Sequence, residues 1–181
     1  MTYKPVHDPT HLYFVTSTLV EWQPLFAHHQ YASIVLNSLQ WHREQERILL
    51  FAVVVMPTHL HWIGKSRDPF EISDVLESFA SYTAHEILKM LRREGRDDWL
   101  TAFAAYAKPG KNHRIWQETE AKSVYSVEFL YEKVEYTHNN PIHRSWNLVA
   151  DRADYCYSSA CFYDRGQEPI IAVDDVRPWL V

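Results

Sequence analysis

Two histidines stand one residue apart in the stretch VVVMPTHLHWI, residues 53–63. On a β-strand, side chains two residues apart point to the same face, so His59 and His61 would both present a ring nitrogen to one ion. The pair alone is a weak signal, because the chain has 11 histidines and two sheet histidines with ordinary hydrogen-bond partners are the alternative. Two ligands do not complete a metal site, so a third donor must come from elsewhere.

A second group of reactive side chains lies in YEKVEYTHNNPIHRSWNLV, residues 131–149. On a helix, Tyr136 and Asn140 are one turn apart on the same face, which places a phenol beside an amide oxygen that can bind a hard cation. A tyrosine is a nucleophile once its proton is removed. Three further tyrosines are alternative nucleophiles: Tyr82, Tyr125 and Tyr131. Tyr136 is the one that Asn-Pro follows at four and five residues.

Two histidines flank this tyrosine and leave two interpretations open. His138 and His143 could donate hydrogen bonds to a phosphate, or they could be surface residues beside a helix end. Neither interpretation changes the candidate metal ligands.

The stretch 89–114 carries seven basic and three acidic side chains in a chain of net charge −5. Cations interleaved with aromatic rings can hold a phosphate backbone and stack unpaired bases, which predicts DNA binding here. A solvated helix face followed by core aromatics is the alternative. The basic residues are Lys89, Arg92, Arg93, Arg96, Lys108, Lys111 and Arg114, with Trp99, Phe103, Tyr106 and Trp116 among or beside them.

The elements that must position these residues follow from hydrophobic periodicity and turn signals. Strands are predicted at 11–20, 47–56, 59–65 and 118–123, the middle two joined as a hairpin by Pro57-Thr58. Helices are predicted at 31–46, 70–95 and 124–139, with a looser segment and a Pro109-Gly110 turn before the last strand. This order predicts an α+β fold with helices packed on an antiparallel sheet.

Length and composition predict one compact domain followed by an irregular tail. The chain has 181 residues, of which 46% are hydrophobic, enough for one sizeable core. The longest apolar run, residues 48–56, is less than half of what a bilayer requires, so we expect no membrane association and a cytoplasmic protein.

Three motifs in the same order resemble those of the HUH single-tyrosine nucleases, especially the REP-associated tyrosine transposases. The family pattern joins VVMPxHxH on a central hairpin, LWQ before a late strand and YxxxNP on the last helix. The chain has VVMPTHLH at 54–61, IWQ at 115–117 and YTHNNP at 136–141. Three motifs in register form a specific signal, and they extend over most of the chain, from about residue 12 to 149.

The resemblance implies a ferredoxin-like, RRM-like catalytic domain, the HUH nuclease fold, over residues 1–150. The tail, residues 151–181, has no assigned role and is expected to pack on the same domain. By the resemblance, His59, His61 and Asn140 would bind Mg²⁺ or Mn²⁺, and Tyr136 would attack single-stranded DNA to form a 5′-phosphotyrosine. Trp116 and Gln117 would contact DNA, with a core position and a turn hydrogen bond as the alternative.

The resulting hypothesis is a metal-dependent single-strand DNA endonuclease and strand transferase that acts on hairpin or repetitive palindromic DNA. A domesticated protein that binds DNA hairpins without cleaving them is the alternative, and a metal hydrolase of a small substrate is a third. The sequence leaves open the target sequence, the choice between monomer and homodimer, and whether the tyrosine acts in its own subunit.

Overall fold

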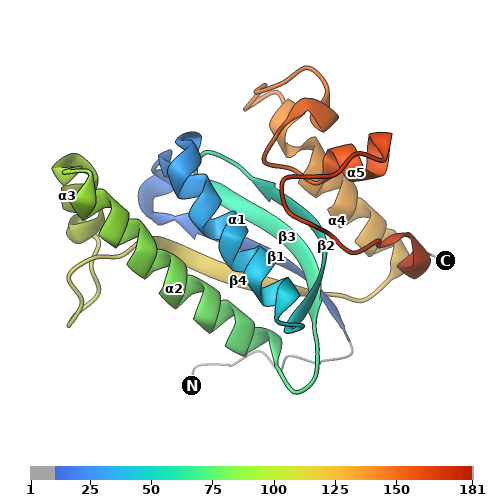
Figure 1. Cartoon of the computed structure of the whole chain (residues 1–181), viewed down its shortest axis with the longest axis horizontal. Helices are drawn as coiled ribbons and strands as arrows, with labels where there is room; N and C mark the ends of the chain where they lie inside the picture. The colour runs from blue at the N-terminus through green and yellow to red at the C-terminus, as the bar shows by residue number, and fades with distance from the viewer. Residues whose placement is uncertain (1–10, 181) are drawn as a thin grey trace.

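The computed structural model describes residues 11–180 as a four-stranded antiparallel sheet with helices on both faces (Figure 1). The strands are β1 Leu12–Leu19, β2 Ile48–Val55, β3 His59–Ser66 and β4 Trp116–Val124, in the spatial order β2-β3-β1-β4. The helices are α1 His29–Glu44, α2 Ile72–Arg93, α3 Asp97–Ala105, α4 Val127–Asn139 and α5 Ala160–Arg165. The predicted α+β class is therefore confirmed.

The larger core lies between one face of the sheet and helices α1 and α2. Alternate strand residues such as Val15 and Trp62 meet helix residues such as Leu39 and Phe79, all of them fully buried. Both helices repeat apolar residues every three to four positions, so each presents one continuous face to the sheet. The two helices cover this face of the sheet, and the core between them and the sheet stabilises the fold.

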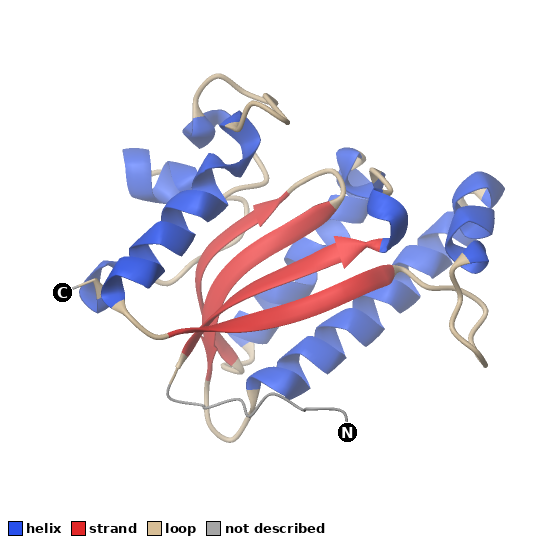
Figure 2. Cartoon of the chain, turned by 180° about the vertical axis from the view of Figure 1, so that it is seen from behind, coloured by secondary structure: helices blue, strands red, loops and turns tan. Residues whose placement is uncertain are grey.

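The opposite face is only partly covered. Helix α4 packs on β2 and β3 through Leu130 and Val134, which join a smaller core with Phe14 and Ile63. Figure 2, seen from behind, shows this face with α4 along one side and the strands uncovered beyond it. The uncovered part belongs to β1 and β4, where Glu118 and Glu120 are exposed. A cleft forms where α4 ends and the open sheet begins.

Most element boundaries agree with the predictions to within about two or three residues, and two details were wrong. The segment predicted to be loose contains helix α3. Val127, predicted to face the core, is exposed in the first turn of α4, whereas Leu130, Val134 and Thr137 are buried. Helix α4 ends at Asn139, as predicted, and a short 3-10 turn, Asn140–Ile142, follows it. The predicted turn at 108–111 is present, closed by a hydrogen bond from the Lys111 amide to the Lys108 carbonyl.

The tail from 151 onward lies along the outer edge of β2. Amides and carbonyls of Val53 and Val55 pair with Ser159 and Tyr157, and Val54 forms a bridge with Ser158. Further along, the Leu50 amide donates to the carboxylate of Asp174. A sheet edge left open would present unpaired donors and acceptors. The tail therefore covers this edge.

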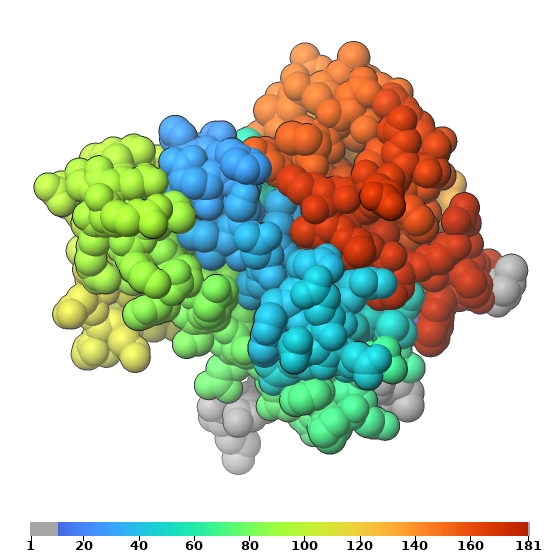
Figure 3. Space-filling model, in the orientation of Figure 1, coloured from blue at the N-terminus to red at the C-terminus, as the bar shows by residue number. Residues whose placement is uncertain are grey.

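The end of the tail also reaches α1, which ties the two faces of the molecule together. Asp174 accepts two hydrogen bonds from the Arg43 guanidinium, and the Ala172 amide donates to Gln40. Figure 3 shows the tail, in red, packed beside α1, in blue to cyan. Among residues 11–180, no helix combines the length and hydropathy needed to cross a membrane.

Candidate functional site

His59 and His61 point from β3 into the cleft on the open face of the sheet. They share that face because two residues along a strand restore the side-chain direction, and their ring centroids lie 4.8 Å apart. Leu60, between them, is buried in the core on the other face. Strand β1 lies directly alongside, with Thr18 paired to His59 and Thr16 paired to His61.

Each imidazole is fixed by a threonine hydroxyl at Nδ1. The Oγ1 of Thr16 lies 2.9 Å from Nδ1 of His61, and Oγ1 of Thr58 lies 2.9 Å from Nδ1 of His59. Nε2 of His61 is buried and has no hydrogen-bond partner among the described residues. A buried ring nitrogen without a partner is costly, which points to a ligand that completes it.

Burial lowers the pKa of both histidines. The pKa of His59 falls to about 4, mainly by burial and partly offset by a hydrogen bond with Asn140. The pKa of His61 falls to about 3, mainly by burial, with smaller contributions from His59 and Lys133. Both rings are therefore neutral at pH 7, and the neutral imidazole is the form that binds a metal.

Tyr136 and Asn140 reach the same cleft from the end of α4. The helix begins at Ser126, whose hydroxyl accepts the amide of Phe129 as an N-cap. One face of the helix then directs Tyr136 toward His61, with ring centroids 5.2 Å apart. The tyrosine side chain is 48% exposed, which leaves it open to a macromolecular substrate. Asn140 is buried, lines the cleft with His59, and donates a 3.4 Å hydrogen bond from Nδ2 to the Tyr136 carbonyl.

The donors gathered here fit a divalent cation. Within residues 11–180, no cluster of three histidine, cysteine or carboxylate side chains is suited to a metal, so a third protein ligand must be of another type. The amide of Asn140 meets that need, since it already contacts His59 and a hard cation accepts amide oxygens. Nε2 of His61 has no partner among the described residues and is therefore available to a metal. The hydrogen bond at its Nδ1 fixes the orientation of the ring.

The cleft has a volume of about 610 Å³ and contains groups that the sequence analysis did not select. Lys133 lies on the same face of α4 as Tyr136, with its ammonium 5.5 Å from the tyrosine ring centroid. Trp22 and Trp146 stand on either side of the histidines, each with its ring centroid 5.7 Å from that of His59. The cleft thus combines a cation, a phenol and exposed aromatic surface.

Helical spacing could have identified Lys133 from the sequence. Lys133, Tyr136 and Asn140 are spaced i, i+3, i+7 and therefore share one face of a helix. The two tryptophans had no such signal. Trp22 is brought in by a 3-10 turn after β1, in which its φ is +52°. Trp146 follows the end of α4 in an irregular loop, so only the tertiary structure places it.

Arg152 holds the end of α4 in place. Its guanidinium donates to Glu135 and Asn139 on α4 and, on its other edge, to Asp164 on α5. The side chain is only 20% exposed, so these charge-assisted bonds are shielded from water. The helix turn that carries Tyr136 is therefore fixed to the tail.

Trp116 and Gln117 do not line the cleft. The indole of Trp116 packs against Phe26 and Phe79 in the larger core and donates its N–H to Thr83. The amide oxygen of Gln117 accepts the backbone N–H of Glu21. The structure therefore places both residues according to the alternative interpretation, a core position and a turn hydrogen bond.

The predicted DNA-binding cations are divided between two places, both outside the cleft. Lys89, Arg92 and Arg93 are exposed on the last turns of α2, which extend beyond the sheet (Figure 1). Arg96 pairs with Asp98, and Arg114 donates to the backbone carbonyls of Trp116 and Gln117. Lys108 and Lys111 stand in the exposed loop that leads into β4. Strand β4 begins at the same end of the sheet as His59.

Of the remaining candidate histidines and tyrosines, His143 lies in the cleft and the others lie outside it. His138 is fully buried and hydrogen bonds to Ser159 in the tail, so it is neither a surface residue nor a group of the cleft. His143 is exposed and lines the cleft. The rival tyrosines Tyr82, Tyr125 and Tyr131 are exposed elsewhere and do not line it.

The fold is that of a REP-associated tyrosine transposase. The chain matches the structure of such a transposase bound to a REP hairpin with a TM-score of 0.66 at 19% identity, over 97% of this chain and 93% of that one. A protein of Deinococcus radiodurans R1 assigned as a transposase matches with a TM-score of 0.43 at 16% identity, over 76% of this chain and 98% of that one. No protein-family model and no curated protein sequence matches the chain.

Proposed function

We propose that the protein is a metal-dependent single-strand DNA endonuclease and strand transferase, in which Tyr136 is the nucleophile. The observation that carries the proposal is the convergence in one open cleft of a half-exposed tyrosine and a His-His-Asn donor set. The shared fold with a transposase that was solved on a REP hairpin supports DNA as the substrate and a hairpin as its form.

In the proposed reaction, the phenol oxygen of Tyr136 attacks the phosphorus of a phosphodiester. A bond forms between that oxygen and phosphorus, and the bond from phosphorus to the 3′-oxygen breaks. The 3′-oxygen leaves as a hydroxyl, so the phenol proton is balanced by the proton that the leaving group gains through solvent. The product is a 5′-phosphotyrosine. Attack by a 3′-hydroxyl reverses the step and joins a strand without ATP.

The chain's own residues prepare this step. Lys133 places positive charge beside the phenol ring and would attract the anionic phosphate to the nucleophile. The threonines hold the imidazoles with Nε2 toward the cleft, so that His59, His61 and Asn140 would bind Mg²⁺ or Mn²⁺. When bound, the cation would polarise the scissile phosphate and neutralise the charge on its oxygens. Trp22 and Trp146 offer surfaces on which unpaired bases would stack.

The experiment uses hairpin DNA with single-stranded flanks, labelled at its 3′ end, and Mg²⁺ or Mn²⁺. The proposal expects a labelled protein band on a denaturing gel. Tyr136→Phe should abolish that band while hairpin affinity stays within a few-fold, because the ring is retained. The matched control is Tyr131→Phe, which alters an exposed tyrosine of the same helix outside the cleft.

Two results would replace the proposal. Hairpin binding without an adduct in the wild-type protein would favour the non-cleaving hairpin binder. If the wild-type protein neither binds the hairpin at low salt nor forms an adduct, a metal hydrolase of a small substrate would be favoured. An adduct that persists in Tyr136→Phe would move the nucleophile to another tyrosine.

A further inference from the structure

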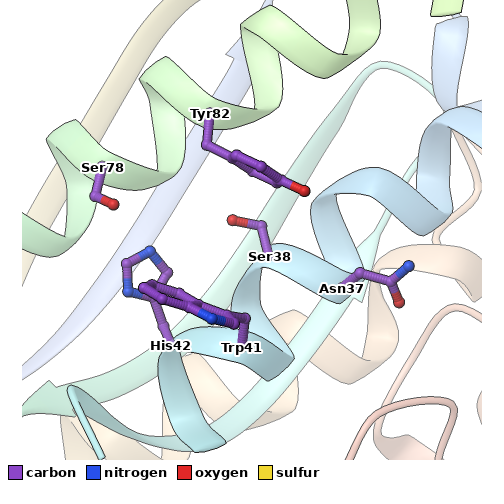
Figure 4. A pocket seen from close by; sticks show the side chains of 6 residues that line it. All are labelled: Asn37, Ser38, Trp41, His42, Ser78 and Tyr82. Atoms are coloured by element: carbon purple, nitrogen blue, oxygen red, sulfur yellow. The ribbon is translucent and has the colours of Figure 1, made fainter. Parts of the chain in front are cut away.

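A second cavity lies between α1 and α2, on the face of the sheet opposite the cleft. Its volume is about 330 Å³, and Figure 4 shows its lining side chains projecting from both helices into the gap. Helix α1 contributes Asn37, Ser38, Trp41 and His42, and helix α2 contributes Ser78 and Tyr82. None of these residues takes part in the proposed cleavage reaction.

The floor of this cavity carries a polar atom that the fold leaves without a partner. His42 is 1% exposed, and its Nδ1 has no hydrogen-bond partner among the described residues. Burial, with the nearby Arg47 as the second cause, lowers the pKa of His42 to about 4, so the ring is neutral at pH 7. Nε of Arg47 is likewise buried without a partner. Unpaired buried groups of this kind are rare in a finished core.

The walls of the cavity are aromatic and reach the surface. Trp41 is 47% exposed and Tyr82 is 55% exposed, and Figure 4 shows them on opposite sides of the gap. The guanidinium of Arg47 lies 5.5 Å from the Trp41 ring centroid and donates to the hydroxyl of Ser78. An aromatic surface backed by hydroxyl, amide and imidazole groups suits a flat heterocycle with hydrogen-bonding edges. No acidic residue lines the cavity, so an anionic ligand would not be repelled there.

A row of exposed side chains on α2, which ends in the cations Lys89 and Arg92, leads away from this cavity. Tyr82, His85, Lys89 and Arg92 follow one another at helical spacing and are all exposed. Helix α2 passes the start of β4 at Thr83, which bonds to Trp116, and then continues beyond the sheet. Lys89 pairs with Glu86, while Arg92 has no ion pair within residues 11–180. The row gives a phosphate backbone a path along the helix.

We propose that the cavity between α1 and α2 binds one nucleobase, held against Trp41 and Tyr82 with its polar edge toward His42. Two sources supply such a base: an unpaired nucleotide in the flank of the substrate strand, or a free nucleotide. The first source rests on the proposed function and accounts for the basic row on α2. The second requires only the cavity.

The test uses the full-length protein and 2-aminopurine, a fluorescent base whose emission falls when it stacks on an aromatic ring. One arm titrates the protein into 2-aminopurine deoxyribonucleoside monophosphate. The other arm uses hairpins that carry 2-aminopurine in a single-stranded flank, one position at a time. Quenching by the mononucleotide assigns the free source, and quenching at one flank position alone assigns the strand.

In the arm that shows quenching, Trp41→Ala and Tyr82→Ala should each weaken binding by about tenfold, the size expected for the loss of one stacking partner. Both positions are exposed, so folding should survive the change. Tyr131→Ala is the control, since it removes an exposed ring outside both cavities. His42→Phe, checked by melting temperature, should weaken binding through the lost polar edge.

Failure of this inference is distinct from failure of the proposed function. Absence of quenching in both arms, or quenching that the Trp41 and Tyr82 variants leave unchanged, would overturn the nucleobase site. Adduct formation on the flanked hairpin at saturating DNA concentration is measured in parallel and should be the same in wild type and variants. A protein that binds the mononucleotide but forms no adduct would keep the cavity assignment and remove the nuclease.

Discussion

The hydroxyl of Thr16 lies 2.9 Å from Nδ1 of His61, directly across the pairing of β1 with β3. Nε2 of the same ring is buried and has no hydrogen-bond partner in the part of the protein that the structure describes. In the tautomer that carries its proton on Nδ1, the ring donates to this hydroxyl, and the electron pair of Nε2 is then free for a metal. We therefore expect Thr16→Val to weaken Mn²⁺ binding by about tenfold, the lower end of the range for such supporting contacts.

Isothermal titration with Mn²⁺ measures this effect, and Thr18→Val is the matched control. Thr18 lies two residues along the same strand and lines the same cleft, but it pairs with His59 across the sheet without a side-chain hydrogen bond to it. Equal affinity in the two variants would remove Thr16 from the support of the site.

Asn140 is expected to act as a ligand and not only as a helix-end residue. Asn140→Ala should lower cleavage at low metal concentration and recover at high Mn²⁺, because water can fill the vacant position. Asn140→Asp should keep activity and tighten metal binding, since a carboxylate adds charge at nearly the same place. Cleavage rates titrated with metal for all three proteins give the half-saturation points. Identical half-saturation points, with only melting temperatures shifted, would assign Asn140 to helix termination alone.

Lys133 should contribute to the chemical step. Its ammonium is only 5.5 Å from the ring centroid of Tyr136 and its side chain is 19% exposed, so water screens its charge only in part. Lys133→Met should slow single-turnover adduct formation by about tenfold or more at saturating DNA, in line with the loss of one positioned charge. Lys122→Met, a change in the same cleft at a 58% exposed lysine, should have a much smaller effect. Equal rates for both variants would contradict this role.

Arg152 should stabilise the site through α4. Arg152→Met leaves Glu135 and Asp164 without their shared cation, and we expect the free energy of unfolding to fall by about 1–3 kcal/mol. Arg165→Met breaks two more exposed ion pairs, with Asp151 and Asp154, and should lower the free energy of unfolding by much less, because water screens exposed pairs. Urea unfolding of both variants makes the comparison. A larger loss in Arg165→Met would show that the tail, and not α4, depends on these cations.

His138 should make the fold sensitive to acid. Burial, aided by Arg152 and opposed by Asp164, lowers its pKa to about 4, whereas the unfolded chain titrates near 6.5. Between these values the unfolded state binds the proton and the folded state does not, so stability is lost as pH falls from about 6.5 to about 4. His138→Gln should reduce that loss by about 1 kcal/mol or more, measured by urea unfolding at pH 7 and pH 4.5. His143→Gln, at an exposed histidine, should leave the pH dependence unchanged.

The parts of the site that could be predicted from the sequence are pairs of residues within a single strand or helix. The His-x-His pair on a strand and the Tyr136–Asn140 pair on a helix depend only on the period of one element, so their common faces could be read directly. The threonine at 16 could not be selected in this way, because its contact with His61 depends on the register between β1 and β3, 45 residues apart. The same limit explains why Trp116 was left between two interpretations. Aromatic residues beside cations have the same pattern whether they face DNA or, as here, a core under α2.

The tail was the least predictable segment. Its hydrogen bonds to β2 join residues about a hundred positions apart, as between Val53 and Ser159, and its turns and short helices have no strong period. Helix α3 was missed because its nine residues lie next to the basic segment and bury a single residue, Phe103. A sequence pattern predicts a helix from apolar residues that recur at helical spacing. Helix α3 has one fully buried residue, so the pattern is too weak to detect.

The position of the tail on β2 has a consequence for the order in which the chain is made. Asp174 bonds to Leu50 across 124 residues, so all of that intervening chain must be synthesised after β2 before this part of the edge is covered. During this interval the nascent protein exposes an unpaired strand rich in valine and leucine, a hazard for aggregation. Another residue of the tail, Arg152, fixes α4, so the turn that carries Tyr136 becomes fixed only after Arg152 has been synthesised. A nascent chain would thus acquire both its protection from aggregation and its fixed tyrosine only after the segment from 151 onward has emerged.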